Sequence, residues 1–366
     1  MRNYIDLIKT IVPEFEPVQT KETFSDIGVD SIDLVAVRVE FERSLGTTIS
    51  DKDWTSFRSF SDIIEYADSP GEKTVANASD LREINETLRI NMPQMALESL
   101  SENWLFKSIG NKHWTLLCEG LGVESDKIED EMGNRLYATF VRIKYECNNS
   151  LAHFVENEEI TLNSQIERYG KGLYFSSVTF NSTRNKLNAE LMTSFARRGG
   201  GGNKDLVKSQ PFTQNNTVRE SGEMPAFGNE YRLLKRKELK AFELDGFQFT
   251  MGEEVLFETE YTLNPYYDLN GVGLLYFAAY PIINDFCEAE YANVELFNAG
   301  NDRWEENYFT KARDILYFSN CDIHEIVVYK LHFVAQDGDL IRTHSSLYRK
   351  SDDKKMAEVF TVKAKK

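Results

Sequence analysis

The chain has 366 residues and a formal net charge of −17 at neutral pH. This acidity argues against a nucleic-acid partner, which would require a basic surface. The 24 Phe and 17 Tyr residues supply enough apolar area for the two or three domains that the length predicts. Residues 1–70 contain 7 Lys/Arg and 14 Asp/Glu, a net −7, so the N-terminal segment is the more acidic part per residue.

The four cysteines are far apart and form no CxxC pair, and the five histidines also stand apart from one another. We therefore expect reduced cysteines and no metal site. No apolar run is long enough to span a membrane, and no signal-like stretch follows Met1. The sequence thus predicts a soluble, cytoplasmic protein without a membrane partner.

Residues 1–70 form the first predicted unit, and it is helical. Apolar residues at helical spacing predict a helix at 4–11 that Pro13 ends. A second helix is predicted from Ser31 to the closing Gly46, and a short one at 61–66. Residues 71–90 are polar and turn-prone, which predicts a linker.

From residue 91 the pattern changes to long helices and strands. A helix is predicted at 97–117, with a break at Gly110, and residues 197–229 are polar enough to predict a mobile connection. The glycines at 199–202 are not followed by Gly-Lys-Ser/Thr and are not a phosphate loop. A second helix is predicted at 271–288. Strands are expected at 136–147, 159–165, 172–182, 190–196, 318–320, 325–334, 339–349 and 356–363.

The order of these elements is similar in residues 91–229 and 230–366, although no internal sequence repeat is visible. Each part has one long helix followed by several strands. This predicts an α+β chain with two antiparallel sheets, each wrapped around a helix and packed side by side.

Ser31 stands at the start of the second predicted helix, in the segment Gly-Val-Asp-Ser-Ile at 28–32. The free N–H groups and the dipole of a helix N-terminus favour a phosphodiester at this position. Asp30 and the acids of the following helix would present an anionic face to cationic partners. The structural alternative is that Ser31 only caps the helix.

Residues 1–67 resemble acyl and peptidyl carrier proteins, whose pattern is a glycine, one residue, and then Asp-Ser-Leu or Asp-Ser-Ile. The resemblance implies a four-helix-type carrier domain. It also implies a 4′-phosphopantetheine attached covalently to Ser31 by a phosphopantetheinyl transferase.

Two stretches, 91–114 and 265–281, have distinctive sequences that indicate a functional role in addition to a structural one. Residues from about 90 to 366 resemble the acyltransferase/decarboxylase of the leinamycin pathway and its relatives, double hot-dog proteins of polyketide gene clusters. The resemblance is carried by Met92-Pro93, 100–105 (Leu-Ser-Glu-Asn-Trp-Leu), Gly110, His113-Trp114, 135–140 and 270–277.

This second resemblance implies an enzyme that decarboxylates methylmalonyl-CoA or malonyl-CoA and delivers the acyl group to a carrier thiol. Coenzyme A thioesters would be its substrates and polyketide synthase components its partners. The family has an active-site tyrosine, for which Tyr137 is the candidate, either attacking the thioester or donating a hydrogen bond. A core tyrosine is the structural alternative.

Decarboxylation of a malonyl-type thioester leaves an enolate, and fixed donors at its oxygen stabilise the developing charge. Asn270 and the backbone N–H groups from Gly271 to Gly273, at the start of the predicted helix, are candidates for this role, although Asn-Gly is also a common turn pair. Further candidates are Tyr267 and Asp268, to orient Asn270; His113, near the substrate or simply packed; and Thr139, on the strand face of Tyr137.

Three functions follow from these features. The leading hypothesis is a self-loading unit whose enzymatic part charges the thiol on Ser31, with fusion making the transfer intramolecular. The second is a thioesterase or dehydratase of the same fold, for which Asp268, Asp285 or Glu288 would supply a carboxylate, although the His-x4-Gly-x4-Pro dehydratase pattern is absent. The third is a non-catalytic module that recognises an acyl carrier.

Overall fold

The N-terminal helical domain is built from four α-helices. The structure is a computed structural model that describes residues 4–68, 82–213, 216–296 and 303–366. The helices are α1 (Tyr4–Ile11), α2 (Ser31–Leu45), α3 (Asp51–Ser56) and α4 (Phe60–Ala67). The predicted helices are confirmed, and Gly46 ends α2 in the left-handed conformation, with φ of 68°. The short helix α3 was not predicted.

Asp30, not Ser31, is the N-cap of α2. Its carboxylate accepts hydrogen bonds from the backbone N–H groups of Ile32 and Asp33. Ser31 is therefore the first residue of the helix, and its hydroxyl is not needed for capping. The alternative that Ser31 only caps the helix is therefore wrong.

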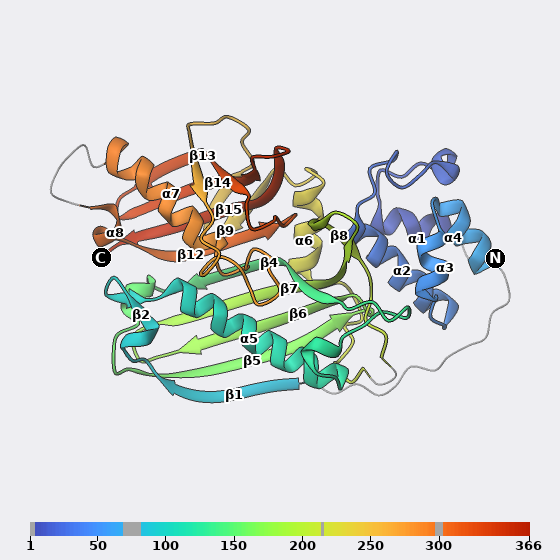
Figure 1. Cartoon of the computed structure of the whole chain (residues 1–366), viewed down its shortest axis with the longest axis horizontal. Helices are drawn as coiled ribbons and strands as arrows, with labels where there is room; N and C mark the ends of the chain where they lie inside the picture. Colours follow the sequence, from blue (N-terminus) through green and yellow to red (C-terminus); the bar gives the residue numbers. More distant parts are fainter. Residues whose placement is uncertain (1–3, 69–81, 214–215, 297–302) are drawn as a thin grey trace.

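The rest of the described chain, from residue 82, forms a body around one eleven-stranded sheet whose strands all pair antiparallel along the main path (Figure 1). The order along the sheet is β1-β5-β6-β7-β4-β12-β15-β14-β13-β11, with β8 paired to β7. The first half comprises β1 (Arg82–Arg89), β4 (Tyr137–Cys147), β5 (Glu159–Tyr169), β6 (Leu173–Asn181), β7 (Lys186–Gly199) and β8 (Gly202–Lys208). The second half comprises β11 (Phe257–Thr262), β12 (Tyr308–Tyr317), β13 (Ile326–Asp337), β14 (Leu340–Arg349) and β15 (Lys354–Lys365).

The two halves have the same strand order, since β11 and β12 to β15 follow one another in space as β1 and β4 to β7 do. They meet where β4 pairs with β12, from Arg142 opposite Leu316 to Glu146 opposite Ala312. We call this contact the seam. The two predicted sheets are thus joined into one.

The linker predicted at 71–90 needs correction, because Arg82–Arg89 pairs along its whole length with β5 as β1. Its alternate residues are half-buried and exposed, a pattern typical of an edge strand that keeps one face in water. Residues 69–81 lie outside the described residues. The strand predicted at 318–320 is also wrong, since β12 ends at Tyr317.

Two long helices lie across one face of the sheet. The first, α5 (Glu102–Leu121), is continuous through Gly110 and starts later than predicted, because 95–100 form a small hairpin of β2 (Met95–Ala96) and β3 (Ser99–Leu100). The second, α7 (Tyr280–Glu295), also starts late, with Pro281 in its first turn. Residues 271–279 are a loop instead, which Asn270 and Gly271 begin as a turn.

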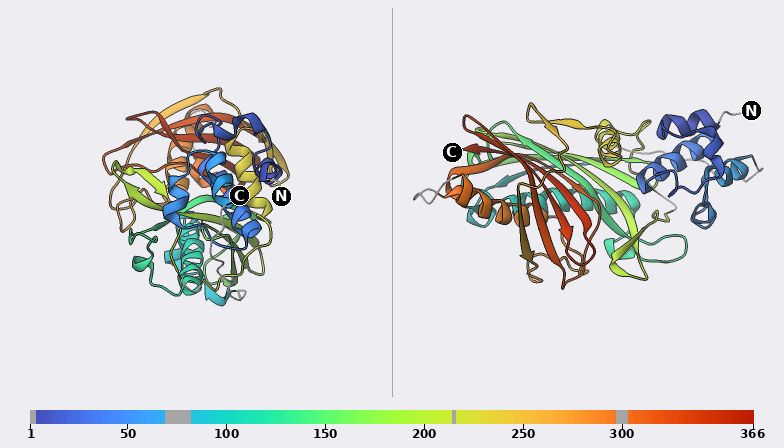
Figure 2. Two further views of the ribbon diagram at one scale, coloured as in Figure 1. Left: turned by 90° about the vertical axis from the view of Figure 1, so that its right-hand side faces the viewer. Right: turned by 90° about the horizontal axis from the view of Figure 1, so that it is seen from above.

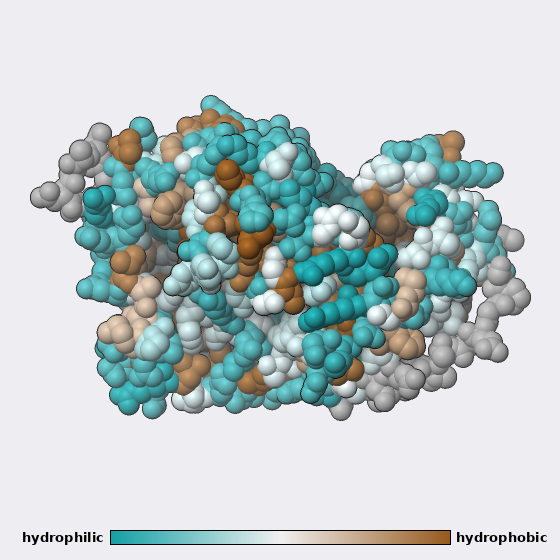
Figure 3. All heavy atoms as spheres, viewed as in Figure 1, coloured by the Kyte–Doolittle hydropathy of each residue, from teal (hydrophilic) through white to brown (hydrophobic). Residues whose placement is uncertain are grey.

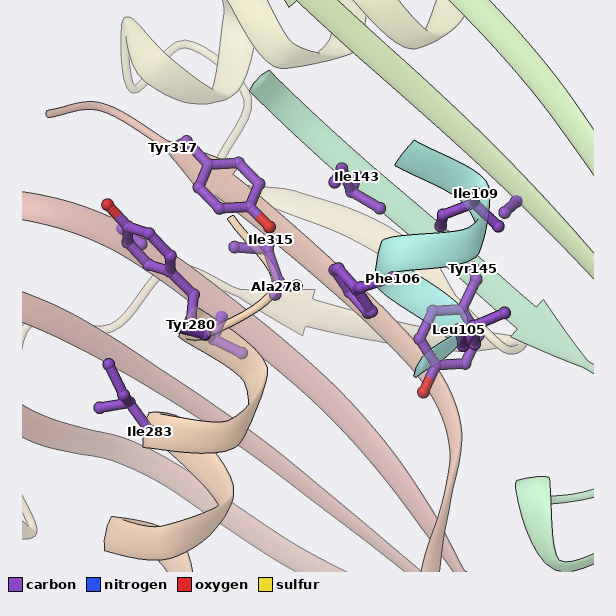
Figure 4. Packing of buried hydrophobic residues seen from close by; sticks show 14 of the residues in the cluster. Leu105, Phe106, Ile109, Ile143, Tyr145, Ala278, Tyr280, Ile283, Ile315 and Tyr317 are labelled. Carbon is purple, nitrogen blue, oxygen red and sulfur yellow. The ribbon is translucent and has the colours of Figure 1, made fainter. Parts of the chain in front are cut away.

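The main core lies between these helices and the centre of the sheet, and Figure 4 shows its two sides meeting. Leu105, Phe106 and Ile109 of α5 face Ile143 and Tyr145 of β4. Tyr280 and Ile283 of α7 occupy the matching place beside β12. Burial of apolar area at this junction joins the two halves into one body.

The opposite face of the sheet is covered by α6 (Ala226–Lys235) and the hairpin of β9 (Ala241–Leu244) and β10 (Phe247–Thr250). Much of the region 197–229, predicted as a mobile connection, is therefore ordered: β7 runs to Gly199, β8 follows, and α6 starts at Ala226. The predicted domain boundary at 229/230 falls inside α6. Figure 2 shows the strongly curved sheet and the N-terminal helical domain at one end of the body.

Candidate functional site

The N-terminal helical domain is docked on α6 through charged side chains. Asp33 Oδ1 accepts from Arg232 Nε at 2.8 Å, and Lys235 Nζ lies 3.3 Å from Asp30 Oδ2. Asp33 is fully buried; burial and the charge of Asp30 raise its pKa to about 6, against the opposing effect of Arg232. The acidic start of α2 thus meets a cationic helix of the same chain, which fixes the position of Ser31.

Apolar packing continues this contact into the sheet. Val39 of α2 lies against Gly170, where an added Cβ would come within 2.1 Å of Val39 Cγ2. One buried cluster includes residues of α2 together with Leu173 and Phe175 of β6. Figure 3 shows the notch on the front face where the two parts meet. Steric fit and charge together define the docked position.

Ser31 lines a cavity at this interface, which we call the Ser31 cavity. Its volume is about 290 Å³. The residues that line it come from the N-terminal helical domain, α6 and both halves of the sheet. They include Ser31, Thr139, Lys208, Tyr231, Lys235, Asn270 and Asn320. A group attached to the Ser31 hydroxyl would therefore extend from the helical domain into the body.

A second cavity, which we call the Tyr137 cavity, has a volume of about 320 Å³. Tyr137 lies in its wall with Trp114 of α5 and Asn270. The guanidinium groups of Arg135 and Arg198 lie 5.3 and 5.2 Å from the centre of the Tyr137 ring. Two positive charges beside a phenol favour a substrate on which negative charge develops.

The two cavities share one wall, formed by Ala138, Phe140, Asn270, Leu274 and Phe277. The rings of Phe140 and Phe277 are 4.1 Å apart between centroids. Gly110 of α5 permits this approach, because a Cβ there would lie 2.3 Å from Phe277 Cζ. The sequence thus brings Ser31 and Tyr137 to opposite sides of one aromatic wall.

Asn270 holds its own loop and lines both cavities. Its Oδ1 accepts from the N–H groups of Val272 and Leu274, at 3.1 and 3.0 Å, which leaves Nδ2 as its side-chain donor. The N–H of Gly273 donates to the carbonyl of Asn270. The predicted set of free N–H groups at a helix start is therefore wrong, because those of Val272 and Gly273 are used within the loop and α7 begins nine residues beyond Gly271.

Of the other residues named from the loop, Gly271 lines a cavity and Tyr267, Asp268 and Gly273 do not. Gly271 lines the Tyr137 cavity, and Gly273 adopts a positive φ of 77°. Asp268 is buried, accepts from Tyr261 Oη at 3.2 Å and from Asn264 N at 2.6 Å, and lines neither cavity. Tyr267 is 75% exposed. Asp268 thus shapes the loop that carries Asn270.

Thr139 and His113 occupy different environments. Thr139 lines the Ser31 cavity, not the Tyr137 cavity, and its Oγ1 donates to the Ser194 carbonyl at 3.0 Å. His113 is fully buried behind Phe140 and lines neither cavity. Its Nδ1 and Nε2 lie 2.8 Å from the hydroxyls of Ser176 and Thr193.

Buried His113 is expected to make the protein sensitive to acid. Burial lowers its pKa from 6.5 to about 3, so between these values the unfolded chain binds a proton that the folded chain does not. Stability should therefore fall as pH drops below 6.5, by about 2 kcal/mol at pH 5 from this residue. Urea unfolding of wild type and His113→Gln at pH 7.5 and pH 5 measures the difference. An equal loss in both proteins would contradict the expectation.

Three cationic residues at the interface, Lys208, Arg232 and Lys235, were missed from the sequence. The available signal was the helical spacing of Phe227, Tyr231 and Leu234, which predicts an amphipathic helix with Arg232 and Lys235 on it. Lys208 ends β8 and donates to Thr139 Oγ1 at 3.2 Å and to Ser194 Oγ. Burial and the nearby Lys235 lower its pKa to about 7.

Residues 6–67 match the family model described as "Phosphopantetheine attachment site". No curated protein sequence matches the chain. The matched segment covers the helical domain and contains Ser31, at the position where the resemblance places the arm. The first part of the chain is thus an acyl carrier domain.

The fold of more than three quarters of the chain is similar to that of solved thioesterase structures. A structure from Lactobacillus plantarum described as an oleoyl thioesterase is 10% identical, with a TM-score of 0.54 over 78% of this chain and 95% of that one. The 12:0-ACP thioesterase from Umbellularia californica is 9% identical, with a TM-score of 0.51 over 78% and 94%. An acyl-ACP thioesterase from Bacteroides thetaiotaomicron is 8% identical, with a TM-score of 0.50 over 77% and 97%.

At these identities the similarities show the fold alone: the large antiparallel sheet matches the hot-dog fold of thioesterases. More particularly, the protein is an acyl carrier domain followed by a body of this fold. Within the described ranges, no helix is long and apolar enough to cross a bilayer. No group of three or more His, Cys, Asp or Glu is placed to hold a metal ion in the part of the chain that the structure describes.

Proposed function

We propose that this protein is a self-loading acyltransferase/decarboxylase of polyketide biosynthesis whose body consists of two joined hot-dog units. It takes methylmalonyl-CoA or malonyl-CoA, removes carbon dioxide, and transfers the acyl group to the phosphopantetheine thiol on Ser31. The observation that carries the proposal is the cavity that Ser31 lines, which shares a wall with the cavity containing Tyr137.

The proposed chemistry uses groups of this chain. The bond from the α-carbon to the carboxylate breaks and carbon dioxide leaves. The electron pair of the broken bond stays with the α-carbon and is delocalised onto the thioester oxygen, which gives an enolate. Asn270 Nδ2 and the Tyr137 hydroxyl stabilise this oxygen, and a proton then returns to the α-carbon. The thiol of the arm finally attacks the carbonyl, and the coenzyme A thiolate leaves with the thiol proton.

The acids around the cavities favour transfer over hydrolysis. Asp205 is the one carboxylate among the described residues that line the two cavities. Asp285 contacts Arg313 and Lys363 at 2.7 and 2.9 Å, and Lys363 also lies 3.1 Å from Glu288. A carboxylate that activates water must be free to accept a proton from it. Those named for that role are instead engaged in hydrogen bonds or ion pairs.

The fold similarity nevertheless supports a second candidate, a thioesterase that releases the acyl chain of the carrier domain. Its body would be the same and its acceptor would be water. The Tyr137 cavity would then hold the acyl group of the arm instead of a coenzyme A thioester.

Intact mass spectrometry distinguishes these functions. The full chain is first treated with a phosphopantetheinyl transferase and then incubated with methylmalonyl-CoA or malonyl-CoA, and its intact mass is measured. Ser31→Ala, which lacks the arm, is the control. A propionyl or acetyl increment on the arm is the expected result. A methylmalonyl or malonyl increment would mean transfer without decarboxylation. Free acid released from a preloaded arm, with no increment, would identify a thioesterase.

A further inference from the structure

The Ser31 cavity is cationic in an otherwise acidic protein. Lysines at four positions line it, and Asp205 is the one acid among the described residues of its wall. The lysines are Lys204, Lys208, Lys235 and Lys354. With a net charge of −17 for the chain, such a set is not expected from composition. A local excess of positive charge in a cavity favours an anionic occupant.

Lys208 differs from Lys204 and Lys235 in its partners. Lys204 pairs with Glu325 at 2.8 Å, and Lys235 lies 3.3 Å from Asp30. Lys208 Nζ donates to two hydroxyls, those of Thr139 and Ser194, and within the described residues no carboxylate lies within 4 Å of it. A half-buried ammonium without a counter-ion is costly, and an anion bound beside it would offset that cost.

The position of Lys208 relative to Ser31 selects the anion. Both residues line the same cavity, and so does Lys235, whose Nζ lies 3.3 Å from Oδ2 of Asp30, the neighbour of Ser31. The group of a phosphopantetheine arm that stays next to the serine is its phosphodiester, whereas the thiol is at the far end. A lysine on the Ser31 side of the Phe140–Phe277 wall therefore faces the phosphate part of the arm.

We infer that Lys208, supported by Lys235, is an anion site that binds the phosphodiester of the phosphopantetheine on Ser31. The inference deepens the proposed function, on which it rests. Held at its phosphate, the arm enters the body with its thiol directed toward the aromatic wall. Lys208 is a positioning residue in this scheme, because it touches the arm and not the reacting atoms.

Phosphorus NMR of the holo full chain tests this site without requiring acyl transfer. The phosphodiester resonance of the folded protein should differ from that of the same protein in urea. Lys208→Met should remove most of this difference, whereas Lys208→Arg should keep it. Lys186→Met, at an exposed position of β7, is the matched control and should match wild type. A resonance unchanged by Lys208→Met, or one equal in folded and unfolded wild type, would overturn the inference.

A second measurement separates the arm from the phosphates of coenzyme A. Coenzyme A is titrated by calorimetry into the Ser31→Ala protein with and without Lys208→Met. Equal affinities are expected, since the site belongs to the arm. A several-fold loss of affinity on removing Lys208 would assign the site to coenzyme A and overturn the inference. Failure of acyl loading with a normal phosphorus result would count against the proposed function alone.

Discussion

Replacing Tyr137 with phenylalanine is expected to slow acyl loading of the carrier domain by about 100-fold or more, the usual effect of losing one donor at a developing oxyanion. The substitution removes one hydroxyl from the Tyr137 cavity and keeps the ring between Arg135 and Arg198. Fold and docking should therefore be unchanged. The measurement is the rate at which the propionyl or acetyl increment appears by intact mass.

Tyr266→Phe is the matched control for this prediction. Tyr266 is 91% exposed and lines neither cavity, so the same loss of a hydroxyl should leave the rate unchanged. If Tyr137→Phe loads the arm as fast as wild type, Tyr137 has no part in the chemistry. If replacing Asn270 also leaves the rate of loading unchanged, a module that only recognises acyl carriers would be favoured.

The largest effect on stability is expected at the seam. Arg142 of β4 and Asp314 of β12 are both fully buried, and Arg142 Nε donates to both carboxylate oxygens, at 3.0 and 3.2 Å. Asp314→Ala leaves the buried Arg142 guanidinium with Glu230 as its remaining carboxylate partner and the Phe227 carbonyl as an acceptor. Breaking such a pair from one side costs about 3–5 kcal/mol of unfolding free energy. Urea unfolding followed by circular dichroism measures the change.

Two further variants make this expectation specific. Glu258→Ala removes an exposed partner of Lys330, 3.9 Å away, and should change stability by about 0.5 kcal/mol or less. The double variant Arg142→Met/Asp314→Leu removes both charges and should recover much of the loss, since the cost comes from the unpaired ion. A loss below about 1 kcal/mol for Asp314→Ala would show that Glu230 is a sufficient partner for the Arg142 guanidinium.

Local patterns predicted much of the fold. The helices around Ser31 and the strands β4, β6 and β14 follow from apolar periodicity, and the repeated order of elements follows from them. The start of α7 could not be predicted in this way. The apolar and aromatic residues at 274–280 are compatible with a helix, but the hydrogen bonds of Asn270 hold the first of them in a loop. Composition alone also failed at 197–229, where polar residues belong to the end of β7, to β8 and to the start of α6.

The candidate site was predictable only in part, for a physical reason. Ser31, Tyr137 and Asn270 belong to sequence motifs, and all three line the adjoining cavities. Lys208 and Arg232 gain their roles from tertiary contacts across long sequence separations, such as the pairing of Arg232 with Asp33. His113 belongs to a sequence motif but not to the site, because its ring is buried between the hydroxyls of Ser176 and Thr193.

Helix α6 contacts both the seam of the sheet and the start of α2. At one end, Arg142 of the seam donates to the Phe227 carbonyl and pairs with Glu230; at the other, Arg232 and Lys235 hold the start of α2. One rigid element thus couples the middle of the sheet to the swinging-arm domain. The carrier domain and the body should consequently melt as one cooperative unit rather than as two independent ones.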